Sequence, residues 1–143
     1  MIAISERPVR RSQWSTISFP STLYLCPVLD LLLAKVPDQW HLEIRLGLQE
    51  ALVNAAKHGN KLDPSKKVSV RFYVVENHYW WVISDQGCGH PTECCFDPET
   101  VNLLPEHESE CGRGLFIIHQ IFDRVQWDNE GRELKLCKQL TPC

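Results

Sequence analysis

Four polar residues at helical spacing interrupt the apolar stretch EALVNAAKHGN, and they suit the binding of a metal ion or a ligand. Glu50 and Asn54 are one helical turn apart, so both project from one face of a helix, and Lys57 and His58 continue the stripe. Their neighbours are apolar, which places the stripe at the edge of a pocket, where buried polar groups must be paired. A metal ion or a ligand would supply that pairing. The alternative is an exposed polar face stabilised by an i,i+4 pair.

A second stretch, VISDQGCG, places a carboxylate where an apolar strand ends. Asp85 at the rim of a sheet can accept a hydrogen bond from a ligand's amino group. Gly87 and Gly89 would let the backbone approach that ligand closely.

A third stretch, CGRGLFII, places Gly112, Arg113 and Gly114 just before a predicted helix. Free N–H groups and the positive end of the helix dipole attract phosphate there, and Arg113 adds a guanidinium fork for phosphate oxygens. Four of the seven glycines lie in these last two stretches, which favours ligand loops over ordinary turns.

Several familiar nucleotide motifs are absent from the sequence. It contains no GxxxxGK[ST] loop, and its GCG lacks the third glycine and following helix of a dinucleotide fingerprint. The glycine-rich loop, strand lysine and HRD set of eukaryotic-type protein kinases is also missing. The three stretches are therefore informative only in combination and in this order.

The hydrophobic pattern predicts the elements that must position these stretches. Strands are predicted at 10–19, 68–74, 79–84, 125–128 and 133–138, and helices at 23–36, 39–58 and 115–122. We expect Asp38 to cap the long helix and Gly59-Asn60 to end it. This order predicts an α+β fold, a two-layer sandwich whose mixed, largely antiparallel sheet carries its helices on one face.

The segment from Gln86 to Cys111 lacks periodicity, apart from a short helix that 97–104 could form. A loop of this length in a compact domain is usually a functional lid or a disordered segment.

Composition limits the class of protein. The chain has 143 residues, the size of one domain (1–143), and a net charge of −3 without a long basic run, which disfavours nucleic acid as a partner. It shows neither a signal peptide nor an apolar stretch able to span a bilayer. Its seven cysteines are odd in number and lack CxxC spacing, so we expect reduced thiols and a cytoplasmic location.

The three stretches together resemble the N, G1 and G2 boxes of the GHKL ATPases, the superfamily of gyrase, Hsp90, histidine kinases and MutL. The motifs EALVNAAKHG, DQGCG and GRGLFII, with the segment FDPETVNLL, are most similar to bacterial anti-sigma-factor serine kinases. The resemblance covers about 38–138. It implies the Bergerat fold, Mg-ATP as ligand, and a serine of a STAS-domain antagonist as phosphoryl acceptor.

The resemblance also implies roles for individual residues. Glu50 would act as the base, Asn54 would hold Mg²⁺, and Asp85 would recognise the adenine amino group. The remaining ATP-binding residues would be Lys57, Gly87, Gly89, Gly112, Arg113, Gly114 and Leu115. His58, at a helix end, is interpreted as structural or close to the ligand rather than catalytic.

The resemblance leaves alternatives for function and partners. We expect a homodimer, with a sigma factor as a further candidate partner and neither nucleic acid nor membrane bound. The alternatives are an ATP-binding partner switch without phosphotransfer and a stand-alone histidine-kinase-type catalytic domain. Cys88, Cys94, Cys95 and Cys111 depart from the family pattern, and a metal or redox role for them is weighed against idle thiols.

Overall fold

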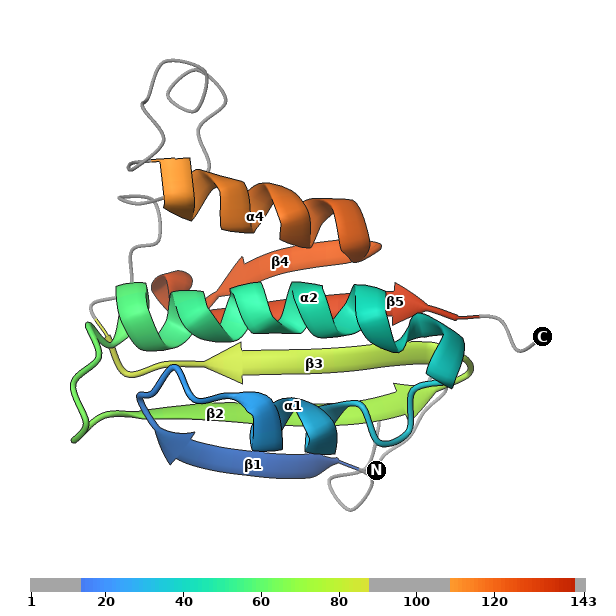
Figure 1. Ribbon diagram of the computed structural model, residues 1–143, viewed down its shortest axis with the longest axis horizontal. Helices are drawn as coiled ribbons and strands as arrows, with labels where there is room; N and C mark the ends of the chain where they lie inside the picture. The colour runs from blue at the N-terminus through green and yellow to red at the C-terminus, as the bar shows by residue number, and fades with distance from the viewer. Residues whose placement is uncertain (1–13, 88–108, 141–143) are drawn as a thin grey trace.

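The computed structural model describes residues 14–87 and 109–140, with the backbone alone described at 109–112. Five strands form one sheet in the order β1-β2-β3-β5-β4, and every neighbouring pair is antiparallel. Three α-helices lie on one face of this sheet (Figure 1). The strands are β1 (Ser15–Pro20), β2 (Lys67–Val75), β3 (His78–Ser84), β4 (Arg124–Asp128) and β5 (Glu133–Gln139), and the helices are α1 (Cys26–Leu32), α2 (His41–Val53) and α4 (Ser109–Ile121). The predicted two-layer α+β sandwich is confirmed. The described sheet is antiparallel throughout rather than mixed.

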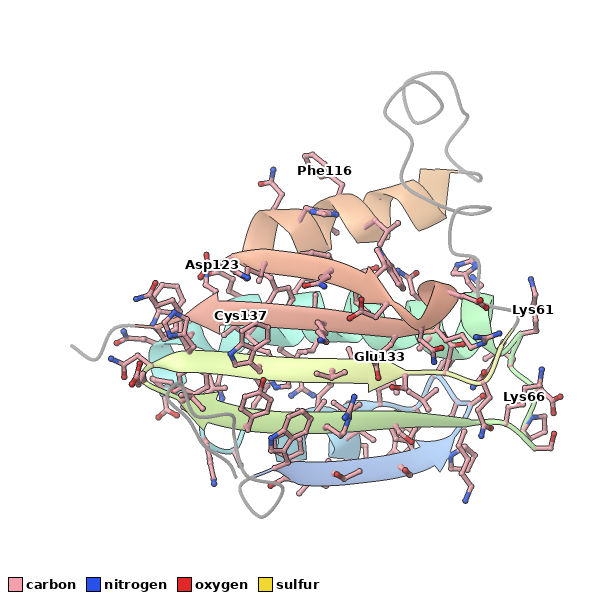
Figure 2. The ribbon with its side chains drawn as sticks, turned by 180° about the vertical axis from the view of Figure 1, so that it is seen from behind. Lys61, Lys66, Phe116, Asp123, Glu133 and Cys137 are labelled. Carbon is pink, nitrogen blue, oxygen red and sulfur yellow. The ribbon has the colours of Figure 1, made fainter. Side chains whose placement is uncertain are left out.

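Alternation along the strands divides the sheet into two faces. Val70 pairs with Ile83 and Phe72 with Trp81, and these side chains face the helices, where Val70, Ile83 and Trp81 are buried. Figure 2 shows the opposite face, which no helix of the described chain covers and from which Glu133 of β5 projects. The core therefore lies between the sheet and the helices, as a period of two residues per strand requires.

The first helix is shorter than predicted. It begins at Cys26, with Pro27 in its first turn, a position where proline is tolerated because no N–H bond is lost. Leu29 and Leu32 face the core, and the Leu32 carbonyl accepts a hydrogen bond from Trp81 Nε1 at 3.4 Å. The first predicted strand is confirmed in its second half as Ser15–Pro20, and its positions 10–13 lie outside the described residues.

The long central helix is confirmed, and it ends at Gly59 with Asn60 as C-cap, close to the predicted end, but its start and its interior differ from prediction. A 3₁₀ turn (Asp38–Trp40) precedes α2, and Asp38 provides no side-chain cap. After α2 the chain continues as a π-helical segment, Asn54–Gly59, in which Asn60 N donates to Ala55 O at 2.9 Å. The helical stripe that was predicted to continue through Lys57 therefore changes its angular position after Asn54, since π turns hold more residues than α turns.

The left-handed residues that follow this helix are Lys61 and Leu62, with φ of 56° and 57°. Gly59 keeps a helical conformation, so the predicted glycine stop is wrong in its mechanism. A glycine is needed at position 59 because a Cβ there would collide with the Asp85 carboxylate.

Helix α4 begins six residues earlier than predicted, at Ser109 rather than at 115. It packs against α2 close to Gly47, where an added Cβ would lie 2.6 Å from Phe122 Cε2. A glycine inside a helix costs about 1 kcal/mol relative to alanine. Here the lack of a side chain at Gly47 lets Phe122, directly after α4, lie close to the backbone of α2.

Candidate active site

One group of predicted site residues meets where α2 ends and α4 begins. A Cβ added to Gly114 would lie 2.8 Å from Glu50 Oε1 and 3.8 Å from Asn54 Oδ1. Residues 64 positions apart in the sequence are thus in contact, and Glu50 and Asn54 are both half-buried. The structure therefore brings a carboxylate and an amide together beside the first turns of a helix, where the dipole is positive.

The position of Gly114 within α4 corrects one prediction. Gly112, Arg113 and Gly114 do not precede the helix but belong to it, and Gly114 lies in its second turn. The N–H groups of α4 without intrahelical partners lie at its start, near Ser109. Gly114 instead provides the space that the Glu50 carboxylate occupies, because any side chain would displace that oxygen.

A second group forms around Asp85, directly after β3. A Cβ on Gly59 would lie 2.9 Å from Asp85 Oδ1 and still closer to Oδ2, so the carboxylate rests on the bare backbone of Gly59. Gly87 N donates to Asp85 Oδ1 at 2.8 Å. A Cβ on Gly87 would overlap the Gly59 carbonyl. Both glycines are therefore required by backbone packing around the Asp85 carboxylate.

The turn at Asp85 is held from two sides. Asp85 N donates to Arg132 O at 2.9 Å, and Arg132 Nε donates to Gly87 O at 3.2 Å. Between them, Gln86 N donates to Asn60 Oδ1 at 2.7 Å. These bonds orient the backbone on both sides of the carboxylate, which is the condition for a preorganised recognition group.

The other predicted site residues vary in their surroundings. Lys57 is half-buried in the π-helical segment, and Arg113 is exposed on α4. Leu115 is 3% exposed and belongs to the core, so its side chain is not available to a ligand. Gly89, the predicted helix at 97–104 and the cysteines at 88, 94 and 95 lie outside the described residues, as does the side chain of Cys111.

Three residues of this region were missed by sequence reasoning. Gly59 and Asn60 were interpreted only as a helix stop, and Arg132 was not considered. The sequence does carry one signal for Asn60, since an amide next to the predicted polar stripe could have been part of it. The role of Arg132 depends on strand pairing, which no local pattern reveals.

The donor atoms of this arrangement decide whether it fits Mg-ATP. Asn54 offers an amide oxygen, a hard ligand of the kind that Mg²⁺ accepts in small number because the ion retains several waters. In the described residues no group of three or more His, Cys, Asp or Glu could hold a metal ion. A single amide oxygen, on the helix beside Gly114, therefore fits a metal carried with a nucleotide better than a resident metal centre.

A separate hollow of about 330 Å³ lies at the other end of β3 from Asp85. It lies between α1 and the β2–β3 hairpin. Residues that line it include Leu32, Lys35, Phe72, Tyr79 and Trp81. None of the predicted site residues lines it.

Across residues 14–87 and 109–140, no helix is long and apolar enough to cross a membrane.

Comparison with known proteins gives a family match over most of the chain. The family described as "Histidine kinase-like ATPase domain" matches residues 29–138. A "Serine-protein kinase RsbW" from Bacillus licheniformis is 30% identical over 87 residues, which cover 59% of this chain and 54% of that protein. The protein of the same name from Bacillus subtilis (strain 168) is 30% identical over 94 residues, 61% of this chain and 56% of its own. The chain thus spans little more than half the length of these relatives.

Proposed function

The chain belongs to the family of histidine kinase-like ATPase domains, and on that premise we propose that it is an ATP-dependent protein-serine kinase. The proposed reaction transfers the γ-phosphoryl group of ATP to a serine hydroxyl of a STAS-domain antagonist. The protein would act as an anti-sigma regulatory factor in a partner-switching module. The names of the RsbW relatives support the kinase class.

The contact between Gly114, Glu50 and Asn54 is the observation that carries this proposal. Phosphoryl transfer requires mainly positioning and neutralisation of charge, with one group to accept the proton of the attacking hydroxyl. Glu50 and Asn54 supply a proton acceptor and a metal ligand one helical turn apart. The first turns of α4, where the helix dipole is positive, lie beside them.

In the proposed mechanism, the serine oxygen bonds to the γ-phosphorus of ATP while the bond from that phosphorus to ADP breaks. Glu50 accepts the proton of the serine hydroxyl in this step. Asn54 would hold Mg²⁺, which would neutralise phosphate charge when bound. Asp85 accepts a hydrogen bond from the adenine amino group, with Gly87 and Gly89 shaping that end of the site. The phosphate end would be completed by Lys57, Gly112, Arg113, Gly114 and the backbone of Leu115.

The partners and the assembly belong to the same proposal. Besides the STAS-domain protein, a sigma factor is the second proposed partner, and the protein would work as a homodimer in the cytoplasm, where transcription is regulated. A binding switch that uses ATP without phosphotransfer is the second candidate. The co-occurrence of Glu50 with Asn54 favours the enzyme, because a switch that only binds nucleotide has no need of a base.

Two substitutions separate the kinase from the switch. Glu50→Gln keeps the side-chain shape but cannot take a proton, and a positioned general base is worth about 10²–10⁴-fold in rate. We expect Glu50→Gln to bind Mg-ATP within a few fold of wild type and to lose most phosphotransfer. Asn54→Ala should lose both, because the triphosphate charge is left uncompensated.

The measurement pairs calorimetric titration of Mg-ATP with single-turnover transfer from labelled ATP to STAS-domain proteins, followed by mass mapping of phosphoserine. Gln49→Ala, an exposed neighbour on α2, serves as the matched control and should behave as wild type. Full transfer by Glu50→Gln would remove its role as base. A wild type that binds ATP tightly yet phosphorylates none of its verified partners would establish the switch instead.

A further inference from the structure

Asn60 is a completely buried polar residue, with 0% of its surface exposed. Its side-chain amide donates to Ser21 Oγ at 2.9 Å and to Lys67 O at 3.0 Å, and its Oδ1 accepts from Gln86 N at 2.7 Å. One amide thus joins the chain after β1, the first residue of β2 and the turn after β3. Two donors and an acceptor are all used, as burial of an amide requires.

The third of these bonds concerns the candidate site directly. Gln86 is the residue between Asp85 and Gly87, so Asn60 Oδ1 holds the middle amide of the turn that presents the Asp85 carboxylate. The amides on either side have other acceptors, Arg132 O for Asp85 N and the Asp85 carboxylate for Gly87 N. Gln86 Oε1 in turn accepts from Lys67 N at 2.7 Å, beside the Asn60 bond to Lys67 O.

We propose that Asn60 is a positioning residue for recognition of the nucleotide base, acting on Asp85 through the backbone of Gln86. This inference rests on the proposed function, in which Asp85 meets the adenine amino group. Asn60 cannot touch a ligand itself, because it has no exposed surface. Its effect on binding must pass through the position of the turn, where a displacement of the carboxylate would weaken a charged hydrogen bond to the base.

The residue type follows from these contacts. A carboxylate at this position could accept from Gln86 N but could not donate to the Lys67 carbonyl, and alanine could do neither. Loss of the acceptor leaves a backbone N–H unpaired, and the turn must move to find water. Loss of the Asn60 NH₂ donor and loss of its Oδ1 acceptor should therefore have different effects on the protein. Its donors connect β1 and β2, whereas its acceptor orients the Asp85 turn.

The experiment compares three variants by thermal unfolding and by calorimetric titration with Mg-ATP and Mg-GTP. Asn60→Ala should weaken ATP binding about tenfold and lower the preference for ATP over GTP by a similar factor, since it loses the placement of one charged hydrogen bond. Phosphotransfer at saturating ATP should stay within a few fold, because Glu50 and Asn54 are untouched. Asn60→Asp keeps the acceptor and should restore most of the ATP-over-GTP preference despite a lower melting temperature.

Ser21→Ala is the matched control. It removes a partner of the Asn60 donor side and leaves Gln86 alone, so it should lower the melting temperature without changing either affinity. Equal loss of base preference in Ser21→Ala and Asn60→Ala would reduce Asn60 to a purely structural residue and overturn the proposal.

Failure of this inference and failure of the proposed function give different results. If Asn60→Ala keeps the wild-type ATP affinity and base preference while wild type binds ATP, only the role of Asn60 is refuted. A wild type that binds no adenine nucleotide refutes the proposed function itself. In unmutated protein, the Gln86 amide should exchange with solvent more slowly than an open turn amide, and exchange at the open rate would overturn the proposal without recourse to variants.

Discussion

Substitution of Gly114 by alanine should uncouple catalysis from nucleotide binding. The added Cβ would lie 2.8 Å from Glu50 Oε1, whereas it would lie 3.8 Å from both Glu50 Cδ and Asn54 Oδ1. The first distance is far inside van der Waals contact and the second is an ordinary one. The methyl group therefore displaces the proposed base and leaves the proposed metal ligand where it is.

The magnitude follows from this displacement. Glu50 Oε1 must retreat by roughly 0.6 Å to reach ordinary contact with the new carbon. A misplacement of about 1 Å in a reacting group can cost about 100-fold in rate, so we expect phosphotransfer at saturating Mg-ATP to fall about 10- to 100-fold. ATP affinity should stay within a few fold. Alanine is also favoured over glycine inside a helix by about 1 kcal/mol, so the melting temperature should not fall.

The assay is single-turnover transfer to a STAS-domain protein that wild type phosphorylates, arranged as a double-mutant cycle with Glu50→Gln. If Gly114→Ala acts by moving the base, it should have little further effect once the base has been removed, and the two losses should be strongly non-additive. Titration of Mg-ATP and thermal unfolding of all four proteins show whether binding or folding has changed instead.

Two results would refute this reasoning. An undiminished rate in Gly114→Ala would mean that the contact with Glu50 has no part in catalysis. Fully additive losses in the cycle would mean that Gly114 affects the reaction independently of Glu50.

Three other predictions concern separate parts of the molecule. Asp85→Asn should weaken ATP binding about 10- to 100-fold, since a charged hydrogen bond is worth about 1.5–3 kcal/mol, and unchanged affinity by calorimetry would exclude Asp85 from the site. Gly47→Ala should lower the melting temperature by a few degrees, because the contact with the Phe122 ring costs more than the gain in helix propensity, and a higher melting temperature would show that the ring yields. Burial raises the pKa of the Cys137 thiol to about 11, so at pH 8 only about one molecule in a thousand carries the thiolate. Iodoacetamide should therefore modify exposed Cys26 well before Cys137, with the Cys137 rate still rising above pH 9, and equal rates at pH 8 would contradict this.

Much of the fold could be predicted because its signals are local. Val68 and Val70 alternate with polar residues at the period of a half-buried strand, and the turn at Glu76 and Asn77 separates β2 from β3 as expected. The one-turn spacing of Glu50 and Asn54 also held, because α2 is regular up to Val53.

The predictions that failed depended on tertiary contacts. Glycine has low helix propensity, so Gly112 and Gly114 suggested a loop, yet Gly114 lies inside α4, where its lack of a side chain leaves room for the Glu50 carboxylate. Gly59 similarly suggested a left-handed helix stop, whereas it is glycine because the Asp85 carboxylate lies on it. The π-helical segment after Asn54 has no sequence signature of its own. Asn60, the residue that follows it, is held by contacts with Ser21, Lys67 and Gln86, which are distant in the sequence.

The contact between Gly59 and Gly87 also has an evolutionary consequence. Neither glycine can be replaced by a residue with a side chain without a clash. A side chain at Gly87 would meet the Gly59 carbonyl, and one at Gly59 would meet the Asp85 carboxylate. Neither position can therefore be the first to change, and a change at both would add a second collision rather than relieve the first. Lineages descending from this sequence should diverge freely at nearby exposed positions with ordinary backbone angles, while both glycines stay invariant for as long as Asp85 keeps its place.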